Sequence, residues 1–235
     1  MSSFQDALIF AATDAQWQKS LIPKLIQAFG ETLYMVSTTI LIGGILGLVL
    51  GLALYTTRRG NLFENVVVYQ VLNVVVNIIR PIPFIIFLTA VRPLTISVVG
   101  TSIGTVAAGF PMIIFCTVAT SRIVEQNLVS ADPGIIEAAR SMGASRLRII
   151  AQILIPECLA PLILGYAFIF VAVVDMSAMA GTVAGGGLGD FALQYGYREM
   201  DDSVTLVAIV VIIILVQLVQ QVANIVAKRL LKKRG

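Results

Sequence analysis

Residues that could do covalent or metal chemistry are scarce in this chain of 235 residues. It contains no histidine, and its two cysteines, Cys116 and Cys158, stand apart within apolar or boundary sequence. Imidazole or thiolate metal sites and a disulfide framework therefore have too few residues to be built. No Gly-x-x-x-x-Gly-Lys-Ser/Thr loop for ATP phosphates occurs. We predict no catalytic residue, no metal and no cofactor, so any ATP has to be bound by a partner protein.

Two charged residues, Arg80 and Asp175, lie inside apolar blocks of the sequence. At a rise of 1.5 Å per residue, Arg80 lies about 21 Å and Asp175 about 25 Å from the predicted cytoplasmic start of its block. Ionisable groups at such depth in a membrane are costly and usually functional. Two alternatives stay open: the two side chains pair with each other, or they contact a substrate or form a gate. The prolines of Arg80-Pro81-Ile82-Pro83 must also break the helix that carries them.

The elements that carry these residues are predicted to be membrane helices. The chain is 58% apolar and 12% charged, against about 45–50% and about 25% in a soluble domain. A crossing needs about 20 apolar residues. We therefore expect an all-α polytopic membrane protein with five transmembrane helices and no large soluble domain. The five blocks are Tyr34 to Thr57, Val66 to Val91, Ile96 to Ala119, Cys158 to Gly181 and Ser203 to Ala227.

Positive charge predicts the orientation of these helices. One side of the membrane would carry eleven Lys and Arg residues and the other side four. Short cytoplasmic loops carry the excess of positive charge, so the amino terminus is expected outside and the carboxyl terminus inside. The same bias and attraction to anionic lipid account for the basic isoelectric point, without nucleic-acid binding.

Three parts of the chain are expected. Residues 1–30 form an outer amphipathic segment, 31–227 the transmembrane domain and 228–235 a basic cytoplasmic tail. Small residues at four-residue spacing predict close helix packing. They are Gly43, Gly47 and Gly51 in the first block, and Gly100, Gly104 and Ala108 in the third. Gly185 to Gly189 is expected to form a flexible or re-entrant turn on the outer side.

The cytoplasmic loop of about residues 121–157 is the one sizeable stretch expected in water. Asp132 and Pro133 predict a helix start, and Gly143 a helix end. Ser145 is expected to cap a second helix that Pro156 ends. Its residues Leu147, Ile150, Ala151 and Leu154 are expected to share one face. The small residues beside Glu137 would let the first helix seat deeply in a groove of another protein.

Glu137-Ala138-Ala139, then Gly143, then Ile155-Pro156, closely resemble the "EAA" loop of the permeases of type I ABC importers. The spacing matches at each landmark, and the loop precedes the next-to-last crossing, as in that family. The resemblance implies that Glu137, Ala138, Ala139, Arg140 and Gly143 couple this chain to an ATPase.

Further motifs resemble the methionine-importer permeases. They are Glu31 to Met35, Arg80 to Phe84, Ser177 to Gly181, Gly185 to Gly189 and Tyr195-Gly196-Tyr197. Ser177 and Met179 join Arg80 and Asp175 as pathway or substrate candidates, with Arg80 facing the carboxylate of an amino acid in one of the two alternatives.

The resemblance implies a translocation subunit in a bacterial inner membrane. Its expected partners are a second copy of itself, two cytoplasmic ATPase subunits that bind ATP, membrane lipid and an external substrate-binding lipoprotein. A permease for another small substrate is the alternative. A secondary transporter is less expected because no inverted repeat is visible, and a membrane scaffold would not need the complete loop.

Overall fold

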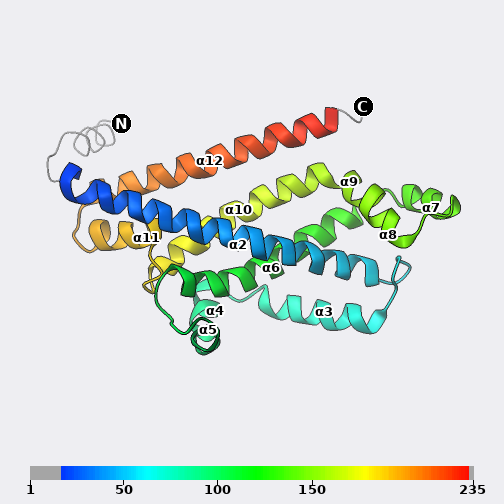
Figure 1. Ribbon diagram of the computed structural model, residues 1–235, viewed down its shortest axis with the longest axis horizontal. Coiled ribbons are helices and arrows are strands. Elements are labelled where there is room, and N and C mark those ends of the chain that lie inside the picture. The colour runs from blue at the N-terminus through cyan, green and yellow to red at the C-terminus, as the bar shows by residue number, and fades with distance from the viewer. Residues whose placement is uncertain (1–16, 233–235) are drawn as a thin grey trace. The chain divides into compact units, whose positions relative to one another are not determined.

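The computed structural model describes residues 17–232, and every regular element in that range is a helix (Figure 1). The four long helices are α2 (Ile22–Thr57), α6 (Thr105–Val129), α10 (Leu159–Gly181) and α12 (Asp202–Lys232). The shorter α-helices are α3 (Val66–Ile79), α4 (Phe84–Ala90), α5 (Arg92–Val99), α7 (Pro133–Ser141), α8 (Arg146–Ile149), α9 (Ile155–Glu157) and α11 (Gly187–Phe191). Three π-helical segments complete the described chain: η1 (Trp17–Leu21), η2 (Ile150–Leu154) and η3 (Ala192–Tyr197).

The candidate membrane spans agree with the number of crossings predicted. Four described helices are long and apolar enough to cross: α2 with the residues from Lys19, α6, α10 and α12. The pair α3 and α4 makes a fifth span when its two sharply bent parts are counted together. The break falls at Arg80 to Pro83, because proline donates no backbone hydrogen bond and clashes with the preceding turn. The predicted break in the second crossing is therefore confirmed.

The predicted start of the third crossing at Ile96 is wrong. Residues 92–99 form the separate helix α5, and the long helix α6 begins only at Thr105. Gly100 and Gly104 both have left-handed backbone angles, with φ of 84° and 94°. Such angles end a helix, so Gly100, Gly104 and Ala108 cannot form the helical packing stripe that was expected.

The helix that carries the third crossing extends beyond the predicted end of that crossing, because α6 continues to Val129. The polar residues from Ser121 onward suggested an aqueous loop. In the structure Ser121 and Glu125 are buried, and the latter forms an ion pair with Arg122 inside the helix. The first part of the stretch predicted to lie in water, from Ser121 to Val129, is therefore helical, and the irregular chain starts at Ser130.

The amino-terminal segment is continuous with the first crossing over its described part. The π-helical turn η1 leads directly into α2, which runs unbroken through residues 22–57 with Pro23 in its first turn. The remainder of the predicted 1–30 segment, up to residue 16, lies outside the described residues. Likewise only residues 228–232 of the basic tail are described, and they continue α12.

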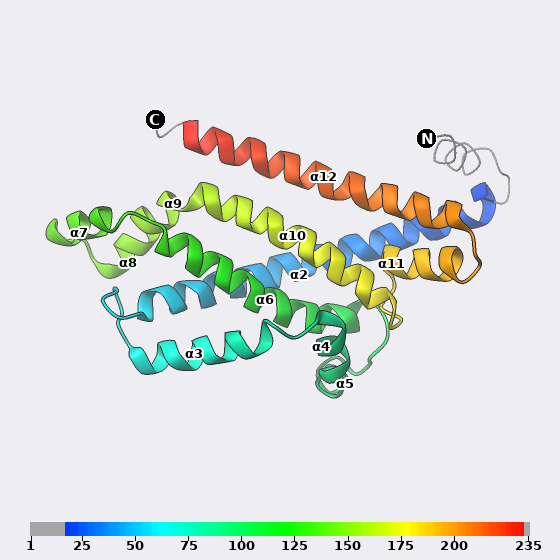
Figure 2. The same cartoon turned by 180° about the vertical axis from the view of Figure 1, so that it is seen from behind.

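Two compact units make up the chain. Over the described residues, the first contains residues 17–41, 83–114 and 170–218, and the second residues 42–82, 115–169 and 219–232. A core cluster of the first unit joins α2, α11 and α12 through Ala28, Leu188, Phe191, Val204 and Ala208. In the second unit α3 lies beside the carboxyl-terminal half of α6 (Figures 1 and 2), where Leu54, Val76 and Val118 share a core cluster.

Candidate functional site

The loop between α6 and α10 builds the helix that the sequence predicted. The Asp132 carboxylate accepts a hydrogen bond from the Gly134 amide at 2.8 Å, and Pro133 occupies the start of α7. Gly143 has a φ of 75°, which a glycine adopts without strain, and the chain turns there after α7. The Ser145 hydroxyl accepts from the Arg148 amide at the start of α8. These predicted caps are confirmed.

Helix α7 is fixed to the second unit by its inward face. Ile136 and Ala139 are 9% and 1% exposed and belong to the core cluster that contains Val124 and Leu128 of α6 and Leu162 of α10. Ala139 therefore packs against its own chain, and its small side chain lets α7 approach these helices closely. It is not part of an exposed docking face. Glu137, Ala138, Arg140 and Gly143 are exposed.

The second helix of the loop does not keep Leu147 and Leu154 on one face, as predicted, and it does not end at Pro156. Leu147 is 72% exposed, whereas Ile149 and Leu154 are buried, and Ile150 is half-buried. The π-helical segment η2 follows α8 directly and shifts the face that points inward, which a uniform helical period does not anticipate. Pro156 does not end the helical run, because a proline near the start of the short helix α9 needs no backbone donor.

The exposed side of the loop combines apolar and basic groups. Met142 is 80% exposed and lies directly before Gly143, and Leu147 follows on α8. Arg140, Arg146 and Arg148 are exposed near them in the chain. This surface fits a partner that offers an apolar pocket with an acidic rim. Met142 was not predicted from the sequence, although a large apolar residue beside a helix-ending glycine was a usable signal.

Arg80 lines a polar groove of about 430 Å³ in the second unit. Asn73 and Asn77 on α3 and Arg122 on α6 line the same groove. The Arg122 guanidinium donates to the side-chain oxygens of Asn73 and Asn77 at 2.5 and 2.6 Å, and to Glu125. This group was not predicted from the sequence, although two asparagines at i, i+4 spacing in an apolar block would have indicated it.

Asp175, Ser177 and Met179 lie on α10 in the first unit, whereas Arg80 belongs to the second. Asp175 is exposed, and Met179 is 36% exposed. Ser177 is buried, and its hydroxyl donates to the Val174 carbonyl of its own helix. The pairing of Arg80 with Asp175 stays a prediction.

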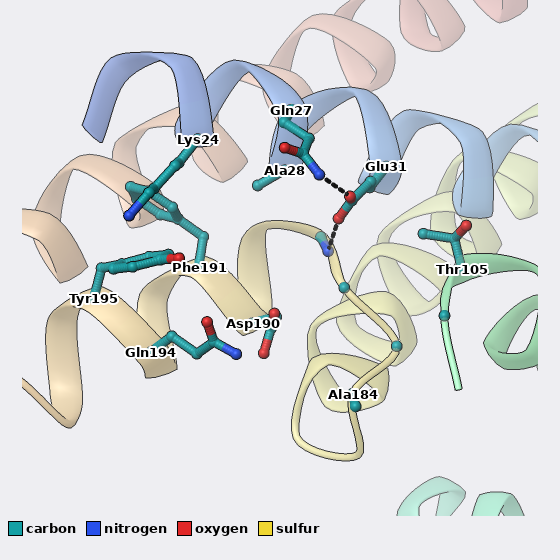
Figure 3. A pocket seen from close by; sticks show the side chains of 14 residues that line it. Lys24, Gln27, Ala28, Glu31, Thr105, Ala184, Asp190, Phe191, Gln194 and Tyr195 are labelled. Carbon is teal, nitrogen blue, oxygen red and sulfur yellow. Dashed lines mark hydrogen bonds between the residues drawn. The ribbon is translucent and has the colours of Figure 1, made fainter. Parts of the chain in front are cut away.

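The glycine-rich turn is held in place by α2 (Figure 3). The Glu31 carboxylate accepts hydrogen bonds from the Gly187 amide at 2.7 Å and from the Gln27 side chain at 2.8 Å. The Thr32 hydroxyl accepts from the Leu188 amide at 2.8 Å. Gly187 has a φ of 86° and lies so close to Thr32 that a side chain would clash. The turn is thus built to seat α11 against α2.

Comparisons with known proteins agree with the family that the sequence motifs indicate. Residues 43–232 match the family described as binding-protein-dependent transport system inner membrane component. The chain is 40% identical over 218 residues to the probable D-methionine transport system permease protein MetI of Vibrio cholerae, covering 93% of this chain and 97% of the relative. It is 42% identical over 166 residues to the corresponding protein of Pasteurella multocida, covering 71% and 76%. A solved inward-facing structure of the MetNI methionine ABC transporter matches with a TM-score of 0.88 and 36% identity, over 90% of this chain and 98% of that chain.

Proposed function

The chain belongs to the family of binding-protein-dependent transport system inner membrane components, and on that premise we propose that it is the translocation subunit of an ATP-driven methionine importer. The observation that carries the proposal is the capped helix α7, which presents an exposed apolar and basic surface while its other face is buried in the second unit. The extensive identity to D-methionine permeases supports methionine as the substrate, in one or both stereochemical forms.

The working assembly we propose contains two copies of this chain, two cytoplasmic ATPase subunits and an external protein that delivers the substrate. The ATPase subunits bind and hydrolyse ATP. The present chain performs no covalent chemistry and provides the path through the membrane. The similarity to a chain of the MetNI transporter supports this division of work.

Coupling follows from how α7 is attached. Glu137, Ala138, Arg140 and Gly143 meet the ATPase, and Ala139 anchors the helix from behind. Ile136 and Ala139 share a close-packed cluster with residues of α6 and α10. Because close-packed cores transmit displacement rather than absorb it, movement of α7 by the ATPase displaces the ends of two crossing helices.

Transport by the reconstituted complex tests this function. Vesicles that contain the two membrane-associated components and the external binding protein should accumulate methionine only when ATP is present on the ATPase side. An excess of another amino acid should not compete. Uptake without ATP would point to a secondary transporter, and preferential uptake of another molecule would correct the substrate.

The coupling surface is tested by Met142→Asp, with Met200→Asp as the matched control. Met142 is 80% and Met200 91% exposed, so neither substitution disturbs a core. We expect Met142→Asp to reduce copurification of the ATPase and uptake by about tenfold, the effect of losing one apolar interface anchor. The control should copurify normally. Equal copurification of both variants would contradict the role of this surface.

We propose Arg80, Asp175, Ser177 and Met179 as residues of the substrate path. If Arg80 and Asp175 pair, Arg80→Gln and Asp175→Asn should each impair assembly or uptake, and the double variant should recover part of the loss. If Arg80 instead meets the substrate carboxylate, its loss should abolish uptake while assembly and ATP hydrolysis persist. Wild-type uptake by both single variants would dismiss both roles.

A further inference from the structure

A pocket of about 340 Å³ in the first unit is lined by side chains of both charges (Figure 3). Lys24 of α2 supplies an ammonium group, and Asp190 of α11 supplies a carboxylate. Tyr195 contributes an aromatic ring, and Gln27 and Gln194 contribute amides. The volume lies in the range of small-molecule sites, about 300–1,000 Å³. The motifs assigned to coupling and to the membrane path do not include it.

The two carboxylates near this pocket differ in how they are satisfied. Glu31 already accepts hydrogen bonds from the Gly187 amide and the Gln27 side chain. Within residues 17–232 no group donates a hydrogen bond to the Asp190 carboxylate, which is half-buried. Burial raises the pKa of Asp190, the nearby Glu31 raises it further, and Arg198 acts in the opposite direction. Asp190 is therefore short of a cationic donor.

Lys24 is held in position without a carboxylate partner in the described chain. Its Nζ atom lies 4.1 Å from the centroid of the Tyr195 ring, a cation–π contact that orients the ammonium over the ring. An ammonium group has three hydrogen-bond donors, and the contact with a ring face leaves donors for an anionic ligand.

The mixture of charges selects the class of ligand. Residues 17–232 hold no group of three or more metal-ligating side chains, and Lys24 would repel a metal ion. Glu31 and Asp190 would repel a phosphate. A molecule that carries both an ammonium and a carboxylate group offers a partner of opposite charge to each of Asp190 and Lys24, which line the same pocket.

We propose that this pocket binds a free α-amino acid as its zwitterion, with the ammonium group on Asp190 and the carboxylate on Lys24. The inference rests on the proposed function, since an amino-acid importer meets such a ligand. It adds a site apart from Arg80 and its groove. The predicted topology places the pocket on the outer side, where it would receive substrate before the crossing.

Calorimetric titration of L-methionine into the purified complex of permease and ATPase, without the external binding protein, tests the site. Asp190→Asn and Lys24→Gln should each weaken binding by about tenfold, as loss of a charge-assisted hydrogen bond does. Glu199→Gln and Lys19→Gln are matched controls, because both residues are exposed and outside the pocket. The controls should bind methionine within about twofold of the wild type. Absence of binding by the wild type, or equal binding by all variants, would overturn the proposal.

Two analogues assign the ends of the ligand. 3-(Methylthio)propylamine lacks the carboxylate, and 4-(methylthio)butyrate lacks the ammonium group. Asp190→Asn should weaken the amine but not the butyrate, and Lys24→Gln the reverse. A variant that has merely lost its fold would weaken both analogues and melt at a lower temperature. Equal losses for both analogues in correctly folded variants would refute the assignment.

The outcome is separable from that of the proposed function. Wild-type vesicles that import methionine with ATP, together with a complex that binds none in the pocket, would reject only the pocket. Pocket binding without ATP-driven import would reject the importer and leave the pocket standing.

Discussion

At the scale of single residues, Arg122 explains how charge is accommodated in the second unit. Its guanidinium contacts Glu125 and the side-chain oxygens of Asn73 and Asn77, and the Arg122 and Glu125 side chains are only 12% and 6% exposed. The stabilisation is local, because the charges of Arg122 and Glu125 pair with each other. The side-chain oxygens of Asn73 and Asn77 accept further hydrogen bonds from the Arg122 guanidinium. A buried pair of this kind is costly to split because one charge then lacks a partner.

We expect Arg122→Gln and Glu125→Gln each to destabilise the permease by about 3–5 kcal/mol, the usual effect of breaking a buried pair. The double variant should recover part of this loss, because no unpaired charge remains. Thermal unfolding of the detergent-solubilised protein measures the change. Arg229→Gln, an exposed arginine near the end of α12, is the control and should melt like the wild type. Additive losses in the double variant would argue against the pair.

Asp190 makes stability depend on pH. Burial and Glu31 raise the pKa of Asp190 above its ordinary value, so the folded protein favours the protonated carboxyl. The stabilising contribution of protonation is present at low pH and is lost as the pH rises through the raised pKa. Asp190→Asn should therefore melt at a higher temperature than the wild type at neutral pH. The difference should shrink as the pH falls through the raised pKa, and it should be lost below the ordinary pKa of an aspartate, where the wild-type carboxyl is protonated in both states. Equal melting temperatures at neutral pH would contradict this account.

At the scale of elements, glycines allow α2 to approach α6 in the second unit. A Cβ atom at Gly47 would lie 2.5 Å from the Thr120 Cβ, and one at Gly51 would lie 2.6 Å from the Ser121 carbonyl oxygen. The predicted packing role of the first glycine stripe is thus confirmed at these two positions. In lipid, such close backbone packing replaces the hydrophobic effect as the cause of helix association.

Gly51→Ala should destabilise the protein by about 1–3 kcal/mol, because the new methyl group meets backbone and the Val124 side chain. Gly30→Ala is the matched control: it lies in the same helix, and its added Cβ would meet no heavy atom within 4 Å. The control should be neutral or more stable by up to about 1 kcal/mol, since alanine is the better helix former. Thermal unfolding of the two purified variants, measured in parallel, tests this prediction. An unchanged melting temperature for Gly51→Ala would show that α6 can move away from the new methyl group.

At the scale of the whole molecule, α12 has the least internal covering of the four spans, with 17% of its most apolar window buried. Ile213, Leu218 and Val222 are exposed on it. Such a face requires lipid or another protein chain, in keeping with the proposed assembly.

Labelling of introduced cysteines tests the orientation. In a background of Cys116→Ala and Cys158→Ala, Tyr197→Cys should react with a membrane-impermeant maleimide added to intact cells. Met142→Cys should react only after the membrane is opened. Tyr197 and Met142 are 77% and 80% exposed, so accessibility within the chain does not limit either reaction. Labelling of Met142→Cys in intact cells would reverse the predicted topology.

The sequence by itself determined the features that depend on local chemistry. Apolar blocks of membrane length, the proline break after Arg80, the Asp132 cap and the left-handed Gly143 each follow from neighbouring residues. The spacing of Glu137-Ala138-Ala139 to Gly143 also indicated the family, which the comparisons confirm. Backbone sterics act over a few residues, and the length of a crossing is a property of one helix. Both can therefore be inferred from the sequence alone.

Only the tertiary structure decided what partners each polar residue has. Arg122 meets Glu125 of its own helix, but its other partners, Asn73 and Asn77, lie about 50 residues earlier in the chain. Ala139 looked like a docking residue until the core behind α7 enclosed it. The pocket of Lys24 and Asp190 joins segments more than 150 residues apart. Burial and pairing depend on which distant segments meet, and no local pattern encodes that meeting.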